Sequence, residues 1–88
     1  MPYEVVEFQQ TPNPNALKCV LDRPIAPAPR SYRSREDVRD DPAAAALFAL
    51  PGVTNLLFLD AWVTVGKSPE TRWATLKPAI TRALRECP

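Results

Sequence analysis

Residues 41–67, DPAAAALFALPGVTNLLFLDAWVTVGK, decide the fold because they hold both ends of a helix and the strand that follows it. Asp41 can accept a hydrogen bond from the first turn of a helix, and the proline after it suits the first helical position. The run 43–50 is rich in alanine and leucine, which favour helices. The dipeptide Pro51-Gly52 ends that run, since proline cannot continue a helix and glycine suits its end. The stretch therefore predicts a helix that ends just before a strand begins.

The second half of this stretch predicts a hairpin. Residues 53–59 are almost wholly apolar from Leu56 onward, and the spacer Asp60-Ala61 is short enough for a tight turn. The returning strand is expected at 62–65. Its side chains alternate between two faces, Val63 and Val65 on one and Trp62 and Thr64 on the other. Glycine at position 66 predicts a bulge or the end of this strand.

A second hairpin is predicted at the N-terminus. Residues 3–9 contain tyrosine, valine and phenylalanine, which favour strands. Residues 16–21 alternate, with Leu17, Cys19 and Leu21 on one face. The segment between the two strands opens with TPNPN at 11–15. A residue before proline is pushed out of the right-handed helical region, so both residues that precede a proline here should be extended.

The turn of this hairpin is therefore predicted at Pro14-Asn15. Proline presets φ at the first central position, and the Asn13 side chain can accept a hydrogen bond from a backbone N–H two residues later. Asn15 tolerates a left-handed φ at the second central position. The turn delivers Lys18 to the face opposite Leu17. Two interpretations of TPNPN stay open: a turn only, or a turn that is also a binding surface.

The remaining segments complete the fold class. Residues 23–39 are rich in proline and arginine, and a short edge strand is expected at 31–34. The last helix should begin with Ser68 or Thr71 as its cap. Its packed face carries, at helical spacing, Trp73, Leu76, Ile80, Leu84 and Cys87. We therefore predict an α+β fold, in the order strand, strand, optional strand, helix, strand, strand, helix. Two helices should cover one face of a mainly antiparallel sheet of four to five strands.

Length and composition narrow the possible functions. The 88 residues suffice for a single domain, 1–88. A net charge of +1 and the absence of histidine argue against a nucleic-acid partner, a hydrolytic triad and a zinc–histidine site. No apolar run reaches about 18 residues, which argues against a membrane-spanning helix. Cys19 and Cys87 are far apart in sequence and are expected as free thiols in a reducing cytoplasm.

Four blocks of the sequence carry a family resemblance. They are TPNPNALK at 11–18, ALFALPGVTNLLF at 46–58, AWVTVGK at 61–67 and WATLKPAI at 73–80. In this order they resemble the N-terminal domain of the Nfu/NifU-type iron–sulfur scaffold proteins, over nearly the whole chain. The resemblance implies a part in iron–sulfur cluster assembly, with iron or a cluster as a ligand on family grounds alone. The C-x-x-C motif that binds the cluster in a second domain of such proteins does not occur in these residues.

Together, the resemblance and the residues predict a non-catalytic interaction module for cluster assembly or delivery. Its expected partner is a protein, either an assembly factor or an apo-target. No bound cofactor is expected, because clusters need more thiolate ligands than two separated cysteines supply. The expected partner-binding surface comprises Thr11, Pro12, Asn13, Pro14, Asn15, Lys18, Thr64 and Lys67.

An alternative function stays open, namely a stand-alone oligomerisation or structural module outside iron–sulfur metabolism. Val6, Phe8 and Trp62 would supply exposed apolar area for it if the helices cover only one sheet face. Either way, we expect a monomer or a weak homo-oligomer. Catalysis is not expected, because the acids show no paired spacing and two glycines are too few for a phosphate-binding loop.

Overall fold

The fold consists of a five-stranded sheet and two α-helices, as seen in a computed structural model that describes residues 3–38 and 41–87. The elements in chain order are β1 (Val5–Gln10), β2 (Ala16–Leu21), β3 (Ala26–Tyr32), the 3-10 helix η1 (Arg35–Val38), α1 (Pro42–Phe48), β4 (Val53–Asp60), β5 (Trp62–Lys67) and α2 (Trp73–Glu86). The strands lie in the order β1-β2-β5-β4-β3, and every neighbouring pair is antiparallel. The predicted α+β class and element order are confirmed.

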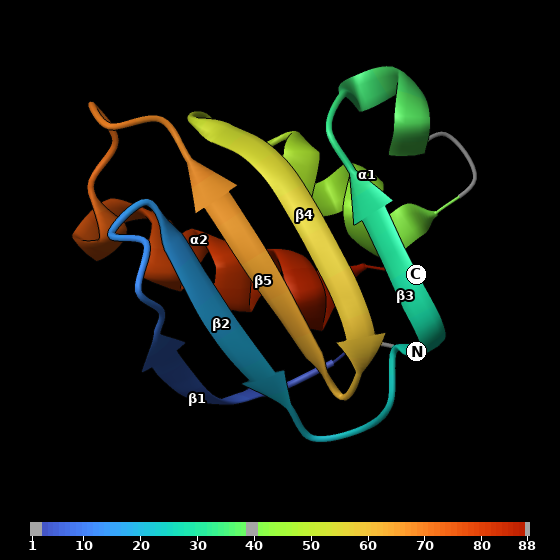
Figure 1. The fold of residues 1–88 in the computed structure, drawn as a ribbon. Coiled ribbons are helices and arrows are strands. Elements are labelled where there is room, and N and C mark those ends of the chain that lie inside the picture. The colour runs from blue at the N-terminus through green and yellow to red at the C-terminus, as the bar shows by residue number, and fades with distance from the viewer. Residues whose placement is uncertain (1–2, 39–40, 88) are drawn as a thin grey trace.

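Both helices cover the same face of the sheet, and in Figure 1 they lie behind it. Alternate residues of the central strands point toward the helices and form the core, as the period of two requires. The fully buried or nearly fully buried members from these strands and from α2 are Leu17, Cys19, Leu21, Leu56, Phe58, Val63, Val65, Leu76, Ile80 and Leu84. No helix in the described part of the chain is long and apolar enough to cross a membrane.

The start and end of α1 follow the prediction. The Asp41 carboxylate accepts a hydrogen bond from the Ala44 N–H at 3.2 Å, and Pro42 is the first helical residue. The same carboxylate accepts from the Tyr32 hydroxyl at 2.8 Å, which ties the cap to β3. After the helix, Gly52 has a φ of 88°, a conformation that side-chain-bearing residues rarely adopt.

The β4–β5 hairpin turns at Asp60-Ala61 as predicted, with Leu59 opposite Trp62. Asp60 supplies the left-handed backbone that the tight turn needs, with a φ of 51°. The prediction for Gly66 is wrong, because it lies within β5 and the register shifts on the facing strand, between Val53 and Asn55.

Two other local predictions are corrected by the structure. The edge strand expected at 31–34 runs instead over Ala26–Tyr32, and the last residue of the segment 23–39 lies outside the described residues. Pro27 and Pro29 fit this strand because an edge strand can spare the N–H groups on its outer side. The last helix begins at Trp73 and not at Ser68 or Thr71, because those two hydroxyls bond each other at 3.0 Å.

Candidate functional site

The segment Thr11–Asn15, which we call the arm, is a closed and internally bonded turn. The Ala16 N–H donates to the Asn13 carbonyl at 3.0 Å, so Pro14 and Asn15 are the central residues. The Asn15 N–H donates to the Asn13 side-chain oxygen at 2.9 Å, as the sequence predicted. Asn15 does not use the left-handed conformation, since Asp60 is the non-glycine residue with positive φ among those described. The predicted position of the turn is confirmed.

Two side chains from the other end of the sequence hold the arm in place. The Lys67 ammonium, on a residue only 8% exposed, donates to the Asn15 side-chain oxygen at 3.1 Å and to the Ser68 carbonyl at 3.3 Å. It also lies 5.4 Å from the centre of the Trp73 ring, within cation–π range. Trp73 in turn donates its indole N–H to the Pro14 carbonyl at 2.9 Å. Lys67 therefore acts as a structural support beneath the arm.

A groove of about 300 Å³ opens between the arm and the start of α2. Its lining residues are Gln10, Thr11, Pro12, Asn13, Pro14, Ala16, Leu17, Trp73 and Lys77. We call it the arm groove. Its walls combine proline and indole surfaces with amide groups and one exposed cation, Lys77, which lies 5.5 Å from the centre of the Phe8 ring. Such a mixture suits a peptide segment that carries both apolar and acidic groups.

The predicted binding residues do not form one surface. Lys18 and Thr64 are cross-strand partners on the sheet face that the helices leave open, and the Lys18 ammonium lies 4.7 Å from the centre of the Trp62 ring. Lys67 shares its strand face with Val65 and points to the helix side, because it is an odd number of residues from Thr64. The structure therefore separates Lys18 and Thr64 from the arm and Lys67.

Trp73 and Lys77 were not among the predicted binding residues. Trp73 was expected on the packed face of the last helix. It is partly buried against the core, and its indole also bonds to the arm. The available signal was their spacing of four, which places them on one stripe at the start of α2. That stripe faces the arm, since both side chains line the arm groove and Trp73 bonds to Pro14.

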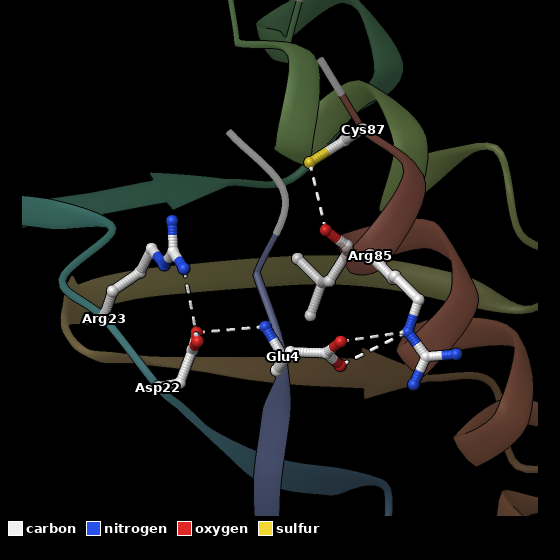
Figure 2. Close-up of polar contacts among 6 residues, drawn as sticks. Glu4, Asp22, Arg23, Arg85 and Cys87 are labelled. Atoms are coloured by element: carbon white, nitrogen blue, oxygen red, sulfur yellow. Dashed lines mark hydrogen bonds and ion pairs between the residues drawn. The ribbon is translucent and has the colours of Figure 1, made fainter.

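Both cysteines lie in the core rather than at this groove. Cys19 is fully buried, and burial raises the pKa of its thiol to about 12. Cys87 is 5% exposed, and burial raises the pKa of its thiol too. Figure 2 shows the Cys87 thiol directed at the backbone of α2, where it donates to the Leu84 carbonyl at 3.4 Å.

These residues do not fit an iron–sulfur cluster. Clusters are held by thiolates, and both thiols here favour the protonated form. Among residues 3–38 and 41–87, no group of three or more histidine, cysteine or acidic side chains lies close enough to hold a metal ion.

The family model described as "Scaffold protein Nfu/NifU N terminal" matches residues 6–87. NifU-like protein 5, mitochondrial, of Arabidopsis thaliana is 32% identical over 85% of this chain and 28% of its own length. The human NFU1 iron-sulfur cluster scaffold homolog, mitochondrial, is 34% identical over 89% of this chain and 32% of its own length. The chain thus spans about a third of these relatives.

Solved structures show the same fold. The crystal structure of protein SAV1430 from Staphylococcus aureus superposes with a TM-score of 0.78 at 18% identity, over 91% of this chain and 96% of that one. SeR13 from Staphylococcus epidermidis gives a TM-score of 0.63 at 22% identity, over 90% and 92%. With the family model covering nearly the whole sequence, the chain belongs to the Nfu/NifU scaffold family and corresponds to its N-terminal part.

Proposed function

We propose that this domain is a non-catalytic protein-interaction module that serves iron–sulfur cluster assembly or delivery without holding the cluster itself. Family membership supports the connection to cluster scaffolds, and the name of the human relative states that connection for that protein. The observation that carries the proposal is the burial of both thiols. A ligand thiolate at Cys19 would have to form where the thiol pKa is about 12.

The arm groove supplies the surface for a protein partner, either an assembly factor or an apo-target. Thr11, Pro12, Asn13 and Pro14 line it on one side, with Lys77 on the other. The arm is bonded to the body of the domain through Asn15 and Pro14, so its shape exists before a partner arrives. A preformed surface reduces the entropy lost on binding. If a partner instead binds the open sheet face, Lys18 and Thr64 are the contact residues there.

Titration of the labelled chain with iron–sulfur assembly proteins, followed by NMR, tests the proposed surface. Amide shifts should map to Gln10, Thr11 and Asn13 and to the first two turns of α2. Lys77→Glu should weaken binding, whereas the matched charge reversal Lys18→Glu on the open face should not. The opposite pattern would move the partner to the open face, and no shift with any assembly protein would refute the interaction role.

Anaerobic reconstitution with iron and sulfide tests the second part of the proposal. We expect no cluster absorption band to remain on the chain after gel filtration, because neither thiol is available as a thiolate near neutral pH. A stable band that disappears in Cys19→Ala or Cys87→Ala would refute this part.

Self-association is a second candidate function that one observation favours. Val6 is 61% exposed and is the large hydrophobic residue that stands out on the described surface. Phe8 and Trp62, expected beside it, are half-buried. Sedimentation over a range of concentrations separates a monomer from a weak homo-oligomer. The cytoplasmic location stays a prediction, and the two relatives described above are mitochondrial by name.

A further inference from the structure

The two edges of the sheet are not equivalent. At one edge, β3 contains Pro27 and Pro29, which have no N–H to offer, and its register with β4 is irregular. At the other edge, β1 pairs only with β2 and contains no proline over its six residues. Natural sheets use prolines and irregularities to stop an edge from pairing with another chain. The β3 edge has both kinds of protection. The β1 edge has no proline, and its register shift lies between Val5 and Glu7, so the run from Glu7 to Gln10 is regular and unprotected.

The direction of the free backbone groups along β1 follows from the hydrogen bonds of β2. The Leu21 N–H donates to the Ala61 carbonyl at 2.7 Å, toward β5, and the Asp22 N–H donates to the Glu4 carbonyl at 2.9 Å, toward β1. Because directions alternate along an antiparallel strand, the even-numbered residues of β2 bond to β1.

The residues of β1 opposite those even-numbered positions are Glu7 and Gln9, which face Val20 and Lys18. Their backbone groups therefore point inward to β2. The N–H and C=O groups of Phe8 and Gln10 then point outward, away from the sheet. Within the described residues, no hydrogen bond to these outward groups is made by another segment. These two N–H and two C=O groups are therefore available to hydrogen-bond with the backbone of another strand.

Both ends of β1 are fixed, so this edge is held in position. At its start, the Glu4 carboxylate pairs with Arg85 of α2 at 3.2 Å, and the Glu4 N–H donates to the Asp22 carboxylate at 3.0 Å (Figure 2). The Tyr3 N–H adds a bond to the Leu84 carbonyl at 2.8 Å. At its end, β1 leads directly into the arm. A fixed strand loses less entropy when another strand pairs with it.

Charges on the two sides of β1 indicate what would pair there. On the helix side, the Lys77 ammonium lies 5.5 Å from the centre of the Phe8 ring. On the open side, Glu7 accepts a hydrogen bond from the Gln9 amide at 2.6 Å. A second copy of the chain, paired antiparallel about Phe8, would bring two Lys77 ammonium groups together, and facing like charges destabilise such pairs.

We propose that the outer edge of β1 accepts an extended segment of a partner protein as a sixth strand, with an acidic side chain of that segment beside Lys77. This deepens the proposed function and rests on it, since it states how a protein partner would bind next to the arm groove. Backbone pairing supplies affinity in this mode, and alternate side chains supply the preference for a sequence.

A capped peptide, acetyl-Thr-Val-Thr-Glu-Thr-Val-Thr-amide, tests strand addition to the labelled full chain by NMR. At about millimolar peptide, the Phe8 and Gln10 amides should shift and exchange more slowly with solvent. Gln10→Pro removes one outward N–H without removing a bond to β2, and should weaken binding about tenfold. Gln9→Ala, whose backbone faces inward, is the matched control and should bind as the native chain does.

A second peptide with lysine in place of glutamate tests the charge preference. The native chain should prefer the glutamate peptide by about threefold, and Lys77→Glu should reverse the order. Unchanged binding in a folded Gln10→Pro variant, or no shift at Phe8 and Gln10, would overturn the proposal. Assembly proteins that shift only the arm groove would leave the proposed function standing without strand addition. If the peptide pairs with β1 but no assembly protein binds the chain, strand addition would stand and the proposed function would be refuted.

Discussion

Replacing Cys19 with alanine should make the domain less sensitive to alkali. Burial raises the pKa of this thiol from the ordinary 9.0 to about 12 in the folded protein. The folded state therefore keeps its proton between these values, while the unfolded chain releases it. Stability from this group is fully present below 9.0 and is lost as pH rises toward 12.

The size of the effect follows from the same shift. Each pH unit in this window lowers the free energy of unfolding by about 1.4 kcal/mol. At about pH 10.5, the native protein should therefore have lost about 2 kcal/mol through Cys19. The Cys19→Ala variant has no thiol at this position, so its free energy of unfolding does not fall through this titration. Near neutral pH the variant should instead be weaker by about 1 kcal/mol, because one buried atom is removed from the core.

Urea unfolding followed by circular dichroism, with a reducing agent present, measures both proteins at neutral pH and at about pH 10.5. The other groups that titrate in alkali are common to both proteins and cancel in the difference. The variant should start less stable and end more stable than the native chain. A difference that does not change with pH would refute the reasoning, since the Cys19 thiolate would then exist in the folded state and could serve as a ligand.

Three further predictions test local contacts, each by urea unfolding. Gly52→Ala should cost about 2 kcal/mol, because φ is 88° and the added Cβ would lie 2.8 Å from the Thr71 Cβ; unchanged stability would contradict this. Asp41→Ala should cost about 1 kcal/mol. It should also lower the pKa of Tyr32, which burial first and then the Asp41 carboxylate raise, and an unmoved absorbance titration would exclude that contact. Trp73→Phe should cost about 1 kcal/mol and speed amide exchange in the arm; equal exchange would show that the indole N–H does not hold it.

The parts of the fold that depend on neighbouring residues were predictable from sequence. The alternation at 16–21 identified the buried face of β2, and the prolines of the arm located its turn. The strand β3 was misplaced because Pro27 and Pro29 argue against a strand anywhere except at an edge. Being at an edge is a property of the whole sheet, so no local pattern reports it.

The candidate site was predictable only in part, for a similar reason. The arm was found from its prolines and asparagines. Its contact with Trp73 joins residues 59 positions apart in the chain, and helical spacing predicted the packed face of that side chain but not its bond to the arm. Lys18, Thr64 and Lys67 were grouped with the arm as polar residues expected near it. Lys18 and Thr64 are opposite each other on neighbouring strands and share one face of the sheet. Lys67 is three residues beyond Thr64 on β5, so it must point to the other face.

The four blocks that identify the family meet at one corner of the molecule. Hydrogen bonds join three of them, through Asn15 and Lys67 and through Trp73 and Pro14, and the strand pairing of Val53 with Lys67 adds the fourth. The spacing between the blocks is therefore set by the lengths of chain needed to bring them together at this corner.

Side chains that are used to assemble the corner are not free to bind a partner. The Lys67 ammonium, the Trp73 indole N–H and the Asn13 side-chain oxygen already have internal partners. Binding then falls to groups of the same corner whose outer sides stay exposed, such as the Lys77 side chain and the backbone of Gln10. Changes at the internally bonded side chains should consequently alter stability more than partner affinity, and changes at Lys77 and Gln10 should do the opposite. A surface of this kind can change its partner while the side chains that hold the corner together stay as they are.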